Sequence, residues 1–106
     1  GFAGAEHFMR QTVRPSAVVC ANDVQAVGCC KYLANNGYRI PEDVAVVGFD
    51  DLPLCDYVTP PLTTIRVPTH FMGQTAAKRL AQIIEEKDAL PVKIEISTSL
   101  RKRKSV

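Results

Sequence analysis

Residues 44–51, VAVVGFDD, form an apolar run that ends in two adjacent carboxylates, Asp50-Asp51. An earlier run at residues 17–21 is also apolar and β-branched, and it ends in Asn22-Asp23. Such unbroken runs are typical of parallel strands covered on both faces, so we expect residues 17–21 to form a central strand. If the two strands lie side by side, both polar pairs project from one sheet edge, where open α/β sheets bind small molecules.

The segment between the two runs predicts a helix. Asn22 or Asp23 provides an N-cap for residues 24–35, and Gly37 provides the left-handed stop that such helices favour. A turn over residues 40–43 then returns the chain to the second run. Strand, helix and parallel strand form a β-α-β unit, which is expected to be right-handed.

The rest of the chain continues the alternation of strand and helix that is typical of α/β proteins. Helical spacing of apolar residues over residues 2–9 indicates the end of an amphipathic helix. The further elements that we expect are a short helix at 52–58, a strand at 62–65, the longest helix from Pro68 or Thr69 to near Lys87, and an edge strand at 92–100.

Composition fits one modest domain without a membrane span. The 106 residues are 46% apolar and 23% charged, and no apolar run approaches the ~20 residues that a span needs. The formal charge of +2 is too small to indicate nucleic acid binding, and we interpret the basic residues 101–104 as a solvated strand end. Because the chain begins at Gly1 without an initiator Met, we interpret it as a fragment.

The cysteines and carboxylates give little support to a metal centre or a catalytic site. Cys20, Cys29, Cys30 and Cys55 lack the spacing of a zinc site or of a secreted disulfide scaffold, so we expect free thiols in a reducing cytoplasm. A phosphotransferase that holds Mg²⁺ through Asp50-Asp51 is an alternative, but no glycine-rich phosphate loop accompanies this pair. We therefore predict no enzymatic activity, no cofactor and no metal.

Asn22 and Asp50 are the candidate ligand-binding residues. Asn22 both donates and accepts hydrogen bonds, and the Asp50 carboxylate accepts several, an alternation that suits a polyol or a nucleobase. Neighbouring parallel strands are ~4.8 Å apart, so both side chains can reach one ligand molecule. The alternative is that Asn22-Asp23 is only a helix cap and Asp50-Asp51 only a turn, and Asp23 is expected to cap the helix in either case.

Four motifs resemble the C-terminal part of the lac-repressor and galactose-repressor (LacI/GalR) family of bacterial transcription regulators. They are PSAVVCANDVQAVG at 15–28, GYRIPEDVAVVGFDD at 37–51, PPLTTI at 60–65 and RKS at 103–105. The resemblance implies an α/β fold like type I periplasmic binding proteins, a Rossmann-like parallel sheet with flanking helices, present only as its C-terminal part. It also implies that Asn22 and Asp50 contact an effector in a cleft between two subdomains.

The resemblance implies a division of the chain as well. Residues 1–67 would belong to the C-terminal subdomain for effector binding and dimerisation, residues 68–92 would add a helix to the N-terminal subdomain, and residues 93–106 would form a returning strand and a basic tail. A homodimer contact is implied at Val24, Val27, Gly28, Lys31, Leu54, Tyr57 and Val58. The apolar patch formed by Val24, Gly28 and Tyr32 would find its partner there, or under another element of the same chain.

The implied function is that of a cytoplasmic repressor core that senses a sugar, a sugar phosphate or a purine. Operator DNA would be bound through an N-terminal helix-turn-helix that this chain does not include. An exported sugar-binding protein of a transporter is the alternative on the same fold. One departure concerns the effector class: Val67-Pro68 stands where the family often has Gln-Pro, so a polar contact that many relatives make is missing.

Overall fold

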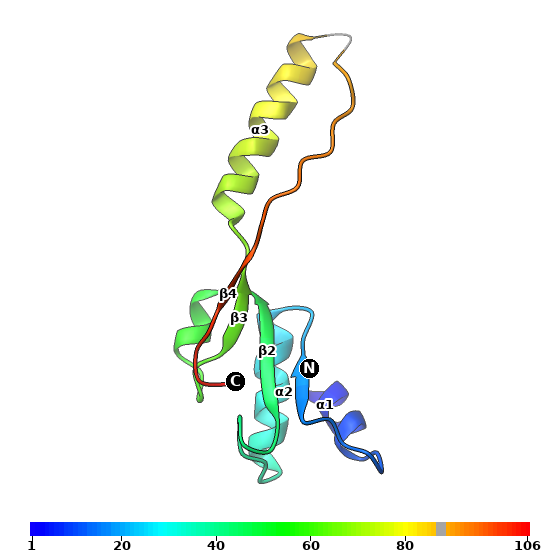
Figure 1. Cartoon of the computed structure of the whole chain (residues 1–106), viewed down its shortest axis with the longest axis vertical. Helices are drawn as coiled ribbons and strands as arrows, with labels where there is room; N and C mark the ends of the chain where they lie inside the picture. Colours follow the sequence, from blue (N-terminus) through cyan, green and yellow to red (C-terminus); the bar gives the residue numbers. More distant parts are fainter. Residues whose placement is uncertain (87–88) are drawn as a thin grey trace. The chain divides into compact units, whose positions relative to one another are not determined.

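The computed structural model describes residues 1–86 and 89–106, which form two compact units. The first unit comprises Gly1–Arg66 and Ser99–Val106, and the second comprises Val67–Thr98. The elements in chain order are α1 (Phe2–Met9), β1 (Ala17–Val19), α2 (Asp23–Asn35), β2 (Ala45–Asp50), a 3₁₀ turn (Pro53–Asp56), β3 (Thr63–Arg66), α3 (Thr69–Glu85) and β4 (Ser99–Arg101) (Figure 1).

The first unit contains one four-stranded mixed sheet in the order β1-β2-β3-β4. β1 pairs with β2 and β2 with β3 in parallel, with Val19 opposite Val47 and Asp50 opposite Arg66. β4 pairs with β3 in the antiparallel direction. The α/β class and the parallel β-α-β unit are confirmed.

Among the described residues, the strand predicted at residues 17–21 does not have a central position. β1 is shorter, ends at Val19 and pairs only with β2 among the described strands, so it lies at the sheet edge. Val19 is 77% exposed there. An unbroken apolar run reports on what covers the faces of a strand, whereas the position of the strand within the sheet depends on pairing that the run itself does not encode.

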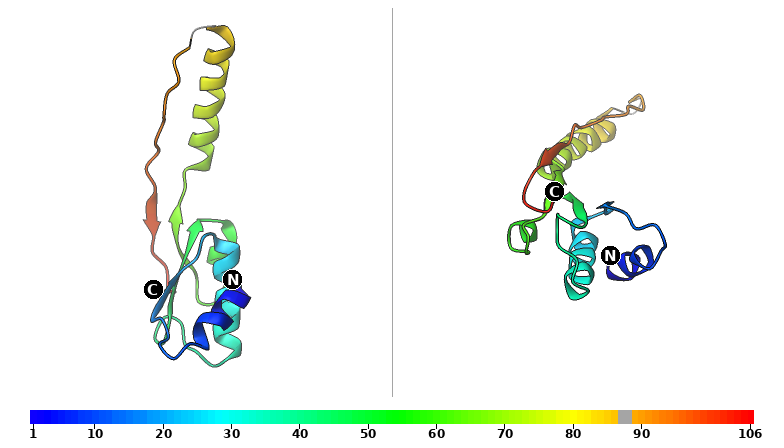
Figure 2. Two further views of the ribbon diagram at one scale, coloured as in Figure 1. Left: turned by 90° about the vertical axis from the view of Figure 1, so that its right-hand side faces the viewer. Right: turned by 60° about the horizontal axis from the view of Figure 1, so that its bottom comes forward.

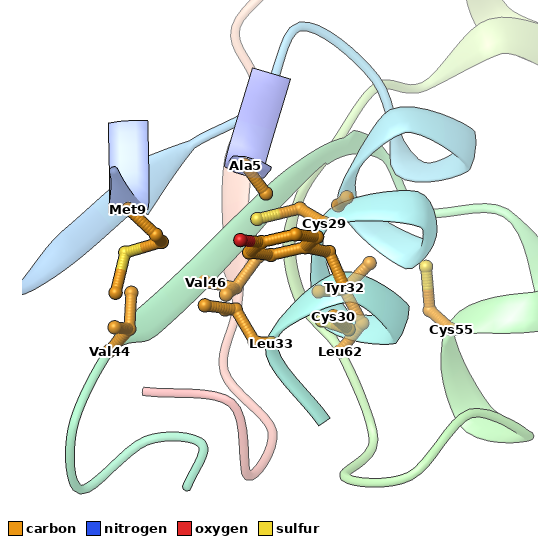
Figure 3. Packing of buried hydrophobic residues seen from close by; sticks show 11 residues of the cluster. Ala5, Met9, Cys29, Cys30, Tyr32, Leu33, Val44, Val46, Cys55 and Leu62 are labelled. Atoms are coloured by element: carbon orange, nitrogen blue, oxygen red, sulfur yellow. The ribbon is translucent and has the colours of Figure 1, made fainter. Parts of the chain in front are cut away.

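The core of the first unit lies between α2 and the sheet, and α1 packs against α2 (Figure 2). Leu33, Val46 and Leu62 are fully buried at its centre (Figure 3). Phe2 of α1 meets Tyr32 of α2 edge to face, with ring centroids 5.2 Å apart. Part of the apolar patch on α2 is therefore covered by an element of the same chain, which was one of the two alternatives.

The second unit exposes most of its apolar side chains. α3 has no buried residue, and Met72, Leu80 and Ile83 line an open groove of about 400 Å³ together with Val92 and Ile94. None of the described helices is long and apolar enough to cross a membrane. The predicted end of α3 near Lys87 lies outside the described residues.

The predicted edge strand at residues 92–100 is mostly absent. Only Ser99–Arg101 are in a strand, because β3 supplies them with a partner, whereas residues 92–98 pair with no described strand. An alternating pattern alone does not make a strand, because a strand also requires a neighbouring backbone to bond to.

Candidate functional site

The two candidate binding residues follow strands that end at the same sheet edge. Asn22 lies three residues after the end of β1 and Asp50 closes β2, and the Cys20 amide donates to the Val47 carbonyl at 2.8 Å where the two strands part. Both residues are partly buried. The sequence therefore brings both side chains to the edge at which parallel sheets bind ligands.

Asn22, and not Asp23, caps α2. Its side-chain oxygen accepts a hydrogen bond from the Gln25 amide at 2.9 Å, and its backbone is extended with φ −154°. Gly37 ends the same helix in the left-handed conformation with φ +78°, as predicted. The cap uses the side-chain oxygen of Asn22 and leaves its NH₂ group as a donor.

Asp23 points into the protein, and the expectation that it caps the helix is wrong. It is fully buried, with Oδ2 accepting from the Leu52 amide at 2.7 Å and Oδ1 accepting from the Thr64 hydroxyl at 2.5 Å. Thr64 Oγ1 in turn accepts from the Asp51 amide at 3.4 Å. A buried carboxylate needs such donors, and they come from β3 and from the turn that follows β2.

The turn after β2 has an unusual backbone. Asp50 and Asp51 have φ values of +115° and +59°, and non-glycine residues at such angles cost of order 1–3 kcal/mol each unless their surroundings hold them. The bonds of Asp23 and Thr64 to the amides of Asp51 and Leu52 supply that support. Within the described residues, the Asp50 carboxylate itself takes part in no hydrogen bond or ion pair.

Asp51 anchors the turn through charge. Its side chain is only 5% exposed and pairs with Arg103 at 2.9 Å and with Arg66 at 3.2 Å. Arg103 also bonds to Asp56 at 2.6 Å and to the Leu62 carbonyl at 3.0 Å. The hydrogen bond to Asp56, together with the nearby Asp51 carboxylate, raises the pKa of Arg103, and the same hydrogen bond from Arg103 lowers the pKa of Asp56.

The interpretation of residues 101–104 as a solvated strand end is therefore wrong for Arg103, whose side chain is 11% exposed. The next residue but one, Ser105, is fully buried. Its hydroxyl donates to the Val46 carbonyl at 2.6 Å and accepts from the Thr63 amide at 2.8 Å. Sequence reasoning found the closing RKS motif by resemblance, but nothing local marked these side chains as buried.

The residues predicted at a dimer contact occupy different environments. Val24 and Tyr57 are 62% and 86% exposed, and Lys31 is also exposed. Val27, Leu54 and Val58 are partly buried against the core. Gly28 faces α1 instead, since a Cβ atom there would lie 3.0 Å from the Phe2 amide nitrogen.

All four cysteines are free thiols, as expected, and two of them share a hydrogen bond. The bond from the Cys29 thiol lowers the pKa of Cys20 to about 7, and the same contact raises that of Cys29. Burial raises the pKa of Cys30 to about 11 and that of Cys55 to about 12. The described residues contain no cluster of three or more side chains that could hold a metal ion.

These pKa shifts predict selective alkylation of Cys20. Because the thiolate is the nucleophile, N-ethylmaleimide should modify Cys20 first, with a rate that rises through about pH 7, below the usual thiol range. Peptide mapping by mass spectrometry after brief labelling at pH 6, 7 and 8 measures this order. Cys20→Ser should remove the fast phase; equal labelling of Cys20 and Cys30 at pH 7 would contradict the prediction.

Known proteins resemble the whole chain. Residues 2–106 match the protein family described as periplasmic binding protein-like domain. The chain is 37% identical to the HTH-type transcriptional repressor PurR of Escherichia fergusonii, in an alignment that covers 100% of this chain and 31% of PurR. It is 38% identical to a lactose operon repressor of Rhizobium radiobacter, over 83% of the chain and 78% of that protein.

A solved structure agrees with these relatives. The lac repressor dimer bound to operator and the anti-inducer ONPF aligns with 98% of this chain and 36% of that chain, at a TM-score of 0.89 and 33% identity. The chain thus spans about a third of the length of the PurR relative and of this repressor. From its motifs, its fold and these relatives, we conclude that the chain belongs to the LacI/GalR family of transcriptional regulators, as a part of the effector-binding domain.

Proposed function

We propose that this chain is the effector-binding and dimerisation part of a repressor, and that Asn22 and Asp50 contact the effector. The observation that carries the proposal is that two strands end at one edge of the sheet. There the Asp50 carboxylate has no bonding partner among the described residues, and the cap on α2 leaves the Asn22 amide group as a donor. A sugar, a sugar phosphate or a purine presents hydroxyl or ring groups that suit this pair.

The proposed mechanism is a shift between two conformations. An effector that binds one cleft geometry more tightly than the other changes their populations, which repositions DNA-binding heads outside this chain. The proposal assigns α3 to the N-terminal subdomain, where its exposed apolar face would be buried. Such a repressor acts in the cytoplasm, and the names of the relatives favour it over the binding protein of a transporter and over an enzyme.

The proposed dimer contact is the surface that combines Val24, Lys31 and Tyr57 with the partly buried Val27, Leu54 and Val58. Aromatic side chains such as that of Tyr57 are enriched in the cores of protein interfaces. The lac repressor to which the chain is similar is a dimer. Light scattering of the full-length protein distinguishes a dimer from a monomer.

Thermal unfolding of the full-length protein with candidate ligands tests the function. D-galactose, glucose 6-phosphate and hypoxanthine represent the three ligand classes, and a ligand at about 100 times its Kd stabilises the folded state by about 2.7 kcal/mol. Asp50→Ala should abolish the shift in melting temperature. Glu42→Ala, an exposed carboxylate that precedes β2, is the matched control and should keep it.

Two results would refute the proposed site. One is an Asp50→Ala variant that keeps the full shift of the wild type, and the other is the absence of any shift with sugars, sugar phosphates and purines.

A further inference from the structure

We propose that Asp23 is a positioning residue for the effector site, because its carboxylate fixes the Asn22 loop against the Asp50 turn. This inference rests on the proposed function, in which Asn22 and Asp50 contact the effector. Among the described residues, Asp23 forms no bond to the Asp50 side chain. It acts through the backbone that follows Asp50.

The two oxygens of Asp23 have different partners from two separate segments. Oδ2 accepts from the amide of Leu52, two residues after Asp50, at 2.7 Å. Oδ1 accepts from the hydroxyl of Thr64 on β3 at 2.5 Å. Because Asp23 directly follows Asn22, one carboxylate joins the end of the first strand to the turn after the second and to the third strand.

Thr64 links the backbone amide of Asp51 to Asp23. The amide nitrogen of Asp51 lies 3.4 Å from Thr64 Oγ1, which accepts the N–H and donates its own hydroxyl hydrogen bond to Asp23, so a relay of amide, hydroxyl and carboxylate spans the turn. The two consecutive positive φ angles of Asp50 and Asp51 need such support. The direction of the Asp50 side chain therefore depends on bonds that Asp23 accepts.

Gly48 shows that the sheet makes room for this carboxylate. A Cβ atom at Gly48 would lie 2.2 Å from Asp23 Oδ1, so only glycine allows the side chain to cross β2 and reach Thr64. A residue that only capped α2 would not need this space. Thr64 lies on β3, two residues before Arg66, the last residue of the first segment of this unit, so the relay also includes that strand.

Substitutions in the relay should reduce the affinity for the ligand more than they reduce the stability of the fold. Asp23→Asn keeps the shape of the side chain but replaces one of its two acceptor oxygens with an NH₂ donor, so the Leu52 amide and the Thr64 hydroxyl can no longer both donate to it. Thr64→Val removes the hydroxyl with little change of volume, and Thr64→Ser restores it. We expect Asp23→Asn and Thr64→Val to raise the Kd on the order of 10- to 100-fold, by analogy with the loss of partners that orient metal ligands.

The experiment measures Kd by calorimetry on the full-length protein, with the compound among D-galactose, glucose 6-phosphate and hypoxanthine that stabilises the wild type. Thr64→Ser should bind within about 3-fold of the wild type, since it keeps the hydroxyl. Ser105→Ala is the matched control, because it breaks bonds between β2, β3 and the tail without touching the turn, and it should lower the melting temperature while Kd stays unchanged.

Amide hydrogen exchange of Leu52, followed by NMR, separates this inference from the proposed function. Its exchange should accelerate at least 10-fold in Asp23→Asn and Thr64→Val, and not in Thr64→Ser or Asp50→Ala. If none of the three compounds binds the wild type, the proposed ligand classes are refuted. The exchange rates of the Leu52 amide would still show whether Asp23 and Thr64 hold the turn. Wild-type exchange or wild-type Kd in Asp23→Asn, or an equal loss of affinity in Ser105→Ala, would overturn the positioning role.

Discussion

Gly48→Ala is expected to destabilise the first unit by about 3 kcal/mol, since added atoms in a packed site force backbone and side chains apart. The new Cβ would lie 2.2 Å from Asp23 Oδ1, 3.0 Å from Leu62 Cδ2 and 3.3 Å from Asp23 Cα. Asp23 cannot retreat without breaking its bonds to the Leu52 amide and the Thr64 hydroxyl. Urea unfolding of the full-length protein measures the loss as a lower midpoint.

Gly73→Ala is the matched control for this prediction. Gly73 lies within α3, and a Cβ atom there meets nothing within 4 Å, so alanine should be neutral or stabilise the helix by up to about 1 kcal/mol. If Gly48→Ala does not fold, Gly48→Ala with Asp23→Ser removes the obstructing carboxylate and should recover part of the stability. If the urea midpoint of Gly48→Ala equals that of the wild type, Asp23 can move away from the new Cβ without loss of stability, and the prediction is wrong.

The β-α-β unit followed from the sequence because its signals are local. Apolar runs, the polar residues before α2 and the glycine after it each report on the backbone within a few residues, and the structure confirms the order of the elements. The location of Asn22 and Asp50 at one edge follows from that order alone, because parallel strands on either side of a crossover helix end at the same edge.

The roles of Asp23 and Arg103 did not follow, because they depend on partners far away in the sequence. Asp before a helix is typical of a cap, but here Asn22 fills that role and Asp23 bonds to Leu52 and Thr64. A basic tetrad at a strand end usually lies in solvent, but Arg103 meets a buried carboxylate. Gly48 inside a strand was the one local signal of a close approach, since glycine weakens strands unless another group needs the space.

Arg103→Met is the second substitution with a large expected effect, a loss of about 3 kcal/mol in the free energy of unfolding. Removing one member of a buried ion pair leaves the other charge uncompensated, which usually costs 3–5 kcal/mol. The Asp51 carboxylate is 5% exposed and, among the described residues, would keep only Arg66, whose side chain is 58% exposed and therefore screened by water. That remaining pair places the expected value at the lower end of the range.

Arg101→Met provides the control, because Arg101 is an exposed arginine two positions earlier in the same segment and should change stability by less than about 0.5 kcal/mol. The bond between Arg103 and the exposed Asp56 contributes little by the same reasoning. Comparison of the two variants by urea unfolding of the full-length protein isolates the buried contact.

The double variant Asp51→Asn with Arg103→Met identifies the mechanism. If the loss in Arg103→Met comes from a stranded charge, neutralising Asp51 removes that charge, and the double variant should be at least about 1 kcal/mol more stable than the sum of the two single losses predicts. If the loss comes instead from the hydrogen bond to the Leu62 carbonyl or from the packing of the arginine stem, the two losses add. Additive losses would therefore assign Arg103 a packing role and leave the Asp51 turn dependent on Asp23 and Thr64.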